Sequence, residues 1–117
     1  MNADLRDFAI RDLGCTACSL YGVPGRVPCE KHHLNEGDQP GRKRRGERFT
    51  VGLCQWHHVG RCLCGGIALI DRDCDMCHVK RGPSWRWHKR EFLDTFGDGD
   101  QLLAVQDRRI ERWGNAA

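Results

Sequence analysis

The sequence predicts a small α+β domain that is held together by zinc. Of its 117 residues, 39% are hydrophobic, so a single apolar core would leave it little net stability. Eight cysteines and six histidines provide metal ligands that can compensate for a small core. Apolar residues recur at helical spacing near both ends of the chain, and the central part contains short segments in which apolar and polar residues alternate. We therefore expect one domain over residues 1–117.

The N-terminal segment, residues 1–13, is expected to be a helix. Asn2 or Asp4 can cap its start, because a short polar side chain accepts hydrogen bonds from the first N–H groups of a helix. Gly14 is expected to end it. The apolar residues expected to share one face of this helix are Leu5, Phe8, Ile10 and Leu13.

Residues 14–60 are expected to form the core. Glycine and proline are frequent between Cys15 and Leu34, which predicts two short strands around a metal-binding turn instead of a helix. Residues 49–53 alternate as a strand does, and a helix is expected over residues 54–59.

The rest of the chain is expected to contain a hairpin and two helices. Residues 61–82 are interpreted as a cysteine-rich hairpin around an aliphatic segment, and residues 83–117 as helices. Ser84 and Asp100 are the expected helix caps. The apolar and aromatic residues expected to anchor these helices are Trp85, His88, Phe92, Phe96, Leu102, Leu103, Val105, Ile110 and Trp113.

The first candidate metal site joins two short motifs. Cys15 and Cys18 form a C-x2-C pair, and Cys54 and His57 form a C-x2-H pair at the start of the expected helix. Each pair can supply two corners of the tetrahedron that zinc prefers. These four residues are the predicted ligands of a structural zinc.

A second structural zinc is predicted in the cysteine-rich segment. Its expected ligands are Cys62, Cys64, Cys74 and Cys77. Three alternatives remain open: a disulfide, one shared multi-zinc cluster, or replacement of one thiolate by His78 or His88. Cys29 could join either site, but we expect it to be a small buried residue beside the first one.

Three histidines remain once the zinc sites have their ligands: His32, His33 and His58. Hydrolysis of a phosphodiester needs a base that activates water and a divalent ion that neutralises the phosphate. Neutral imidazole can act as the base, and it can also coordinate the ion. The three histidines are therefore the candidate catalytic residues.

Charge and the N-terminal residues bear on partners and location. The formal net charge is only +3, but five basic residues lie within seven positions between the two histidine pairs: Arg42, Lys43, Arg44, Arg45 and Arg48. We expect this basic loop to contact DNA phosphates. Residues 1–7 do not resemble a secretory signal, and the longest aliphatic run is short, so we expect reduced thiols, no membrane contact and a cytoplasmic location.

Three short motifs occur in a fixed order: Cys-x2-Cys, then His32-His33-Leu34, then Leu53-Cys54-x2-His57-His58. This order resembles the HNH, or ββα-metal, endonuclease motif. It is most similar to the phage Ref family of RecA-dependent recombination nucleases. The likeness covers about residues 14–106. Its weaker downstream matches are Gly82-Pro83-Ser84, His88-x3-Phe92, Phe96-Gly97 and Leu102-Leu103.

This resemblance implies a ββα core in which two strands and a helix hold one catalytic ion, Mg²⁺ or Mn²⁺. By position, His33 would be the general base, and His32 and His58 the metal ligands. It also implies DNA as substrate, RecA filaments as partner, and the host cell cytoplasm as the location of a phage-encoded protein. The expected function is thus DNA endonuclease; the alternatives are a non-catalytic, zinc-stabilised nucleic-acid-binding adaptor and, less favoured, a redox-sensing thiol protein.

The chain departs from the motif at one position. Many HNH motifs carry an asparagine or histidine that orients the base, before the second metal-binding pair. Here that stretch contains Glu47, Arg48, Phe49, Thr50 and Val51. A backbone carbonyl or Glu47 is therefore expected to hold the other nitrogen of His33.

Overall fold

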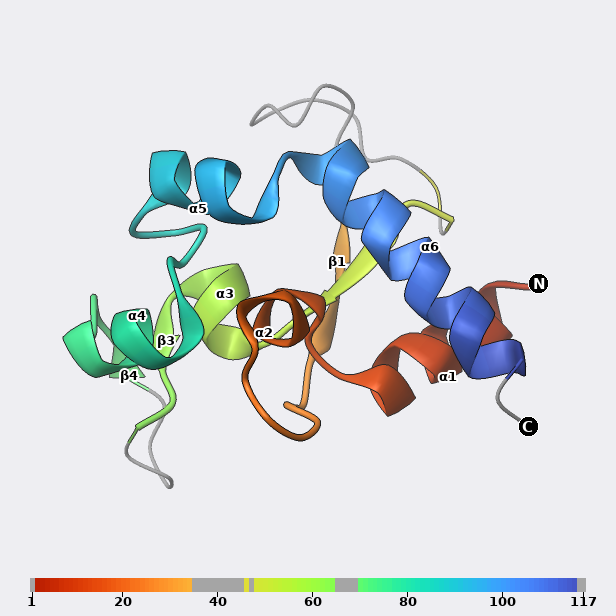
Figure 1. Cartoon of the computed structure of the whole chain (residues 1–117), viewed down its shortest axis with the longest axis horizontal. Helices are drawn as coiled ribbons and strands as arrows, with labels where there is room; N and C mark the ends of the chain where they lie inside the picture. The colour runs from red at the N-terminus through yellow and green to blue at the C-terminus, as the bar shows by residue number, and fades with distance from the viewer. Residues whose placement is uncertain (1, 35–45, 47, 65–69, 116–117) are drawn as a thin grey trace.

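The computed structural model describes residues 2–34, 46, 48–64 and 70–115, and these form an α+β structure with two small sheets (Figure 1). Its elements in chain order are α1 (Ala3–Leu13), α2 (Thr16–Tyr21), β1 (Glu30–His33), β2 (Thr50–Leu53), α3 (Gln55–Val59), β3 (Arg61–Cys62), β4 (Ile70–Asp71), α4 (Asp75–Arg81), α5 (Lys89–Phe96) and α6 (Gly99–Asn115). No helix within these ranges is long and apolar enough to cross a membrane.

Strands β1 and β2 form an antiparallel pair at the centre of the molecule (Figure 1). Glu30 lies opposite Leu53, and His33 lies opposite Thr50. All four residues of β2 are buried, whereas β1 is half-buried. The expected strand at 49–53 and helix at 54–59 are present. Because α3 follows β2 directly and Leu53 pairs with Glu30, the start of α3 lies next to β1.

The main core joins this strand pair to the helices that surround it. Trp56 on α3 is fully buried, and its indole N–H donates to the carbonyl of Gly82 at 2.9 Å. Phe92 and Phe96 of α5 pack together at 4.8 Å between ring centres. The cysteines of both predicted zinc sites, except the exposed Cys64, belong to the same core, so zinc bound there would also stabilise the core packing.

Helix α6 is joined to the centre through a buried amide. Gln106 is fully buried, and its Oε1 accepts hydrogen bonds from Thr16 Oγ1 and Gly52 N, both at 2.8 Å. These two donors belong to α2 and β2. The Gln106 side chain therefore links α6 to α2 and β2. Its burial was not expected from the sequence, because glutamine is usually a surface residue.

Helix α1 begins and ends as expected, but its buried face is different. Asn2 Oδ1 accepts from Leu5 N at 2.8 Å, and Gly14 ends the helix. Leu5 and Phe8 are exposed, so the predicted apolar face is wrong for these two residues. Arg6 is buried in their place, because its guanidinium donates to the side chain and carbonyl of Thr50 in β2.

The expectation of two strands and no helix between Cys15 and Leu34 is wrong. Thr16–Tyr21 forms α2, and β1 is the one strand in this segment. The Cys15 sulfur accepts from Cys18 N at 3.3 Å and so caps the helix. The glycines and prolines that suggested strands begin only at Gly22, which ends α2 with φ +86°.

The hairpin expected over residues 61–82 is present only in its first part. β3 and β4 pair antiparallel, but residues 75–81 form α4. The helix forms because this segment contains a second C-x2-C pair at a helix start, as α2 does. Cys74 is the N-terminal cap of α4, and Cys77 lies three residues later within the helix.

Neither Ser84 nor Asp100 caps a helix. Residues 85–87 form turns, and α5 begins only at Lys89, because hydrogen bonds hold this segment against the end of α3. Asp98 replaces Asp100 at the start of α6, since its Oδ1 accepts from Gln101 N at 2.9 Å.

Candidate functional site

The four residues of the first predicted zinc site come together in the core. The ligand atoms of Cys15, Cys18, Cys54 and His57 all lie within 4.8 Å of one another, and all four residues are buried. The His57 Nδ1 lies 3.4 Å, 3.5 Å and 3.2 Å from the sulfurs of Cys15, Cys18 and Cys54. The sulfurs of Cys18 and Cys54 are 3.8 Å apart.

These distances fit a tetrahedral zinc ion. Zn–S bonds of about 2.3 Å and Zn–N bonds of about 2.0 Å separate two sulfurs by about 3.8 Å, and a sulfur from the nitrogen by about 3.5 Å. His57 Nε2 lies 2.7 Å from the carbonyl of Arg81, so it carries the proton and leaves Nδ1 for the metal. The cluster could therefore hold zinc without rearrangement.

The pKa values of these thiols indicate which of them carry protons that zinc would have to displace. Burial raises the pKa of Cys15, but hydrogen bonds from Cys18, Cys54 and His57 outweigh it and leave that pKa far below the usual value. Because Cys15 takes the negative charge, its hydrogen bond raises the pKa of Cys18 to about 12, and that of Cys54 also rises. Zinc uptake must release protons from Cys18 and Cys54.

The second predicted set also converges. The sulfurs of Cys62, Cys64, Cys74 and Cys77 lie within 4.8 Å of one another, apart from the first group. Cys64 is exposed and the other three are buried. All four are free thiols, with S–S separations such as 3.7 Å between Cys64 and Cys74, so neither a disulfide nor one shared cluster is formed.

Two donors stabilise negative charge in this second cluster. The backbone N–H of Cys64 and the guanidinium of Arg72 lower the pKa of Cys62 to about 6. The Arg72 Nη2 lies 3.4 Å from the sulfur of Cys62 and 3.8 Å from that of Cys74. Four thiolates around zinc would carry a net negative charge, which Arg72 partly balances.

The residues considered as substitute ligands have other partners. His78 Nε2 lies 2.9 Å from Glu91, and His88 Nε2 lies 2.8 Å from Asp73. Cys29, expected to be a small buried residue, is only half-buried, and its thiol donates to the carbonyl of Ile10 at 3.4 Å.

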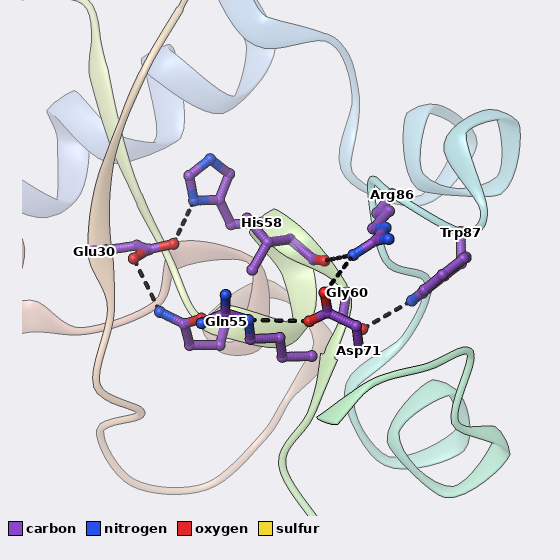
Figure 2. Close-up of polar contacts among 9 residues, drawn as sticks. Glu30, Gln55, His58, Gly60, Asp71, Arg86 and Trp87 are labelled. Atoms are coloured by element: carbon purple, nitrogen blue, oxygen red, sulfur yellow. Dashed lines mark hydrogen bonds and ion pairs between the residues drawn. The ribbon is translucent and has the colours of Figure 1, made fainter. Parts of the chain in front are cut away.

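A third group of polar side chains lies where β1 meets α3 (Figure 2). His58 Nδ1 is 2.6 Å from Glu30 Oε1, and Gln55 Nε2 donates to Glu30 Oε2 at 2.9 Å. His58 Nε2 faces His32 Nδ1 at 3.0 Å. The structure therefore brings together His32 and His58, two of the three predicted catalytic histidines.

The carboxylate of Glu30 determines which nitrogen of His58 is available. An acceptor at Nδ1 holds the proton there, so Nε2 presents its lone pair toward His32. Two nitrogens bound at right angles to one octahedral ion, each at about 2.1 Å, lie about 3.0 Å apart. The donor set thus fits a shared divalent ion, and the side chain of His58 is 24% exposed, which leaves room for further ligands.

His33 lies next to His32 at the end of β1, and it is half-buried. Side chains alternate along a strand, so Glu30 and His32, which both contact His58, lie on the face toward α3, and Lys31 lies on the other. The ion pair of Lys31 with Asp7 in α1, at 3.0 Å, agrees with this alternation.

Sequence reasoning missed Glu30 and Gln55. A usable signal was present for Glu30, because residues i and i+2 of a strand share a face and Glu30 stands two positions before His32. Most of the basic loop (Arg42, Lys43, Arg44 and Arg45) lies outside the described residues, as does Glu47. Arg48 is described and exposed, beside Arg6, Asp107 and Glu111.

Comparison with known families shows the family to which the chain belongs. A family model described as "recombination enhancement, RecA-dependent nuclease" matches residues 2–111. The chain belongs to this RecA-dependent nuclease family. Searches of curated proteins and of solved structures found no match.

Membership of the RecA-dependent nuclease family covers α1 to most of α6, and therefore all three polar clusters. The family description indicates a nuclease that works in recombination, for which DNA is the substrate. Two of the clusters could hold structural zinc. The third lies at the junction of β1 and α3.

Proposed function

We propose that this RecA-dependent nuclease is a metal-dependent DNA endonuclease of HNH type, with β1, β2 and α3 as its ββα core. The observation that carries this proposal is the facing pair of His32 Nδ1 and His58 Nε2, 3.0 Å apart and backed by Glu30. The buried Cys and His cluster at the start of α3 supports it, because zinc bound there would fix the helix that carries His58.

In this proposal His32 and His58 hold Mg²⁺ or Mn²⁺. The ion would neutralise charge on the scissile phosphate and the leaving oxygen. Glu30 holds the ring of His58 through its Nδ1, and Gln55 holds Glu30 in turn. All four of these side chains come from β1 and α3, so the strand pairing and the first Cys and His cluster together position them.

His33 is proposed as the general base. It adjoins the ligand His32 at the end of β1, and neutral imidazole accepts a proton from water near neutral pH. The residue that orients His33 is proposed to be a backbone carbonyl or Glu47. The basic loop and Arg48 would contact phosphates without reading the sequence, so DNA affinity should fall steeply with salt.

Nicking of supercoiled plasmid tests the proposal. Purified zinc-loaded protein is incubated with Mg²⁺ or Mn²⁺, with and without RecA filaments and ATP. We expect wild type to nick DNA under at least one of these conditions, with RecA increasing the activity. His33→Ala should abolish nicking while zinc content and folding are kept.

The control is His78→Ala, which removes an imidazole that pairs with Glu91 and belongs to none of the proposed ligand sets. This variant should nick like wild type. Full activity in His33→Ala would contradict the base assignment. DNA binding without nicking under every condition would instead support the non-catalytic adaptor.

A further inference from the structure

A pocket of about 410 Å³ adjoins His58 at the C-terminal end of α3. Its lining residues are His58, Val59, Trp85, Arg86 and Lys89. The lining thus combines a large aromatic ring with two permanent cations, and it includes no carboxylate. This volume is in the range of pockets that bind small organic molecules.

The wall of the pocket is held firmly beside His58. Three hydrogen bonds join residues 85–87 to carbonyl groups of α3 and its end: Trp85 N to His57 O (3.1 Å), Arg86 Nη1 to Val59 O (3.1 Å) and Trp87 Nε1 to Gly60 O (2.8 Å). Figure 2 shows the last two of these bonds on the same helix end that carries His58. Gly60 has φ +75°, and a Cβ there would collide with the Trp87 ring, so this close approach requires glycine.

The two cations of the pocket differ in their partners. Arg86 pairs with Asp71 at 3.1 Å and lies over the ring of Trp87, so its charge is partly balanced. Lys89 is exposed, and its ammonium lies 4.7 Å from the centre of the Trp85 ring. No carboxylate in the described part of the chain pairs with Lys89. The unbalanced charge of the pocket is therefore on an exposed side chain next to an aromatic ring.

An aromatic ring beside an unpaired cation suits a nucleotide, which has a flat base and an anionic phosphate. We propose that this pocket binds one unpaired nucleotide of the DNA strand next to the scissile phosphate. The base stacks on Trp85, and Lys89 moves from the ring to the phosphate. Base stacking on an aromatic ring stabilises more than an exposed cation–π contact does, so the exchange is favourable.

This inference rests on the proposed function, and it specifies the substrate further. Inside a duplex both faces of a base are covered by its neighbours, so a base reaches Trp85 only if it is unstacked. The pocket lies against His58, one of the proposed metal ligands. The nuclease should therefore prefer DNA that is single-stranded at the position next to the cut.

Binding in the absence of added Mg²⁺ or Mn²⁺ tests this preference. The zinc-loaded protein is titrated into a short fluorescein-labelled oligothymidylate, and separately into a blunt duplex of the same length. Trp85→Leu should weaken binding to the single strand about 5- to 150-fold and leave duplex binding unchanged. Trp85→Phe should retain most of the affinity, because it keeps a ring against Phe92.

Lys89→Gln provides a second readout at an exposed position. Neutralising one phosphate contact on a single strand should reduce the slope of log K against log salt by about 0.7. The control is Trp113→Leu, which alters an indole at the far end of α6 that is bonded to Asp12, and it should bind like wild type.

Unchanged affinity in Trp85→Leu with an unchanged salt slope in Lys89→Gln would overturn the inference. Equal weakening for single strand and duplex would also overturn it, because it would indicate a general electrostatic surface. Tighter binding of oligouridylate than of oligothymidylate would do so too, in favour of RNA. Failure of wild type to nick plasmid would contradict the proposed function alone, since this binding is measured without catalysis.

Discussion

Glu30 and His58 are joined by a 2.6 Å contact between Oε1 and Nδ1, across the junction of β1 and α3. The carboxylate is 40% exposed, and the histidine also faces His32 through its other nitrogen. A carboxylate behind a metal-binding imidazole fixes its orientation and raises its basicity. Glu30 is therefore a positioning residue in the proposed site, although no recognised motif includes it.

Substitution of Glu30 should weaken metal binding at the active site. In Glu30→Gln the amide keeps the shape of the side chain but loses the charge that supports His58. We expect the Mn²⁺ concentration for half-maximal nicking to rise, or the nicking rate to fall, by about 10- to 100-fold. Titration of plasmid nicking with Mn²⁺ measures this.

The control is Glu91→Gln, an exposed carboxylate that pairs with His78 on other elements. Its Mn²⁺ dependence should match that of wild type. A Glu30→Gln enzyme with wild-type Mn²⁺ dependence would show that this carboxylate has no part in the site.

Loss of the first zinc cluster should unfold the protein. Cys18 is 1% exposed and packs in the main core, so Cys18→Ala removes a ligand where no solvent can replace it. Structural zinc contributes directly to folding, and we expect this variant to lose zinc and helical signal together. Metal analysis and circular dichroism measure both.

Cys29→Ala is the matched cysteine control, because Cys29 bonds only to a backbone carbonyl among the described contacts. It should keep two zinc ions and remain folded. If Cys18→Ala kept both ions as well, the ligand assignment would be wrong.

The second cluster should release zinc at a pH that depends on Arg72. The pKa of Cys62 is lowered from 9.0 to about 6 by the Cys64 N–H and by Arg72. A lowered pKa stabilises the thiolate form fully above pH 9, and this contribution is lost as the pH falls through 6. Arg72→Gln should raise that pKa, so protons compete with zinc at higher pH.

We therefore expect the midpoint of zinc release on acidification to move upward in Arg72→Gln, by about one pH unit or less. A colorimetric zinc indicator follows the release. Arg108→Gln, an exposed change on α6, should leave the midpoint in place. A downward movement in Arg72→Gln would contradict the electrostatic role of this arginine.

Removal of the buried amide on α6 should destabilise the fold. Gln106→Leu keeps a similar volume but removes the acceptor of Gly52 N and Thr16 Oγ1. An unpaired buried donor costs about 1–3 kcal/mol, and we expect a loss of this size in urea unfolding of the zinc-loaded protein. Arg108→Leu on the exposed side of α6 should change stability by less than about 0.5 kcal/mol. An equal effect of both changes would argue against the hydrogen bonds.

The local features of this fold were predictable from sequence because their causes are local. The spacing of Cys15 and Cys18, and of Cys54 and His57, brings each pair to one turn, and the two pairs do converge. The alternation of residues 49–53 likewise predicted β2. Helix α2 was missed because the glycines and prolines that follow Tyr21 dominate the composition of the whole segment.

The remaining features depend on contacts between distant elements. Helical spacing of Trp85, His88, Phe92 and Phe96 predicted a helix from Ser84 onward, but hydrogen bonds from residues 85–87 to the end of α3 delay α5 until Lys89. Gln106 looks like a surface residue in sequence and is buried only because α2 and β2 both offer it donors. Glu30 likewise gains a partner only through the pairing that sets β1 beside α3.

Mn²⁺ binding to the zinc-loaded protein tests the central claim most directly. Electron paramagnetic resonance counts bound Mn²⁺ in wild type, in His58→Ala and in the control His78→Ala, alongside zinc analysis and plasmid nicking. The account predicts one Mn²⁺ per chain in wild type and in the control. It predicts that His58→Ala loses both the Mn²⁺ and the nicking activity while keeping its zinc. A His58→Ala protein that binds Mn²⁺ and nicks DNA like wild type would contradict it.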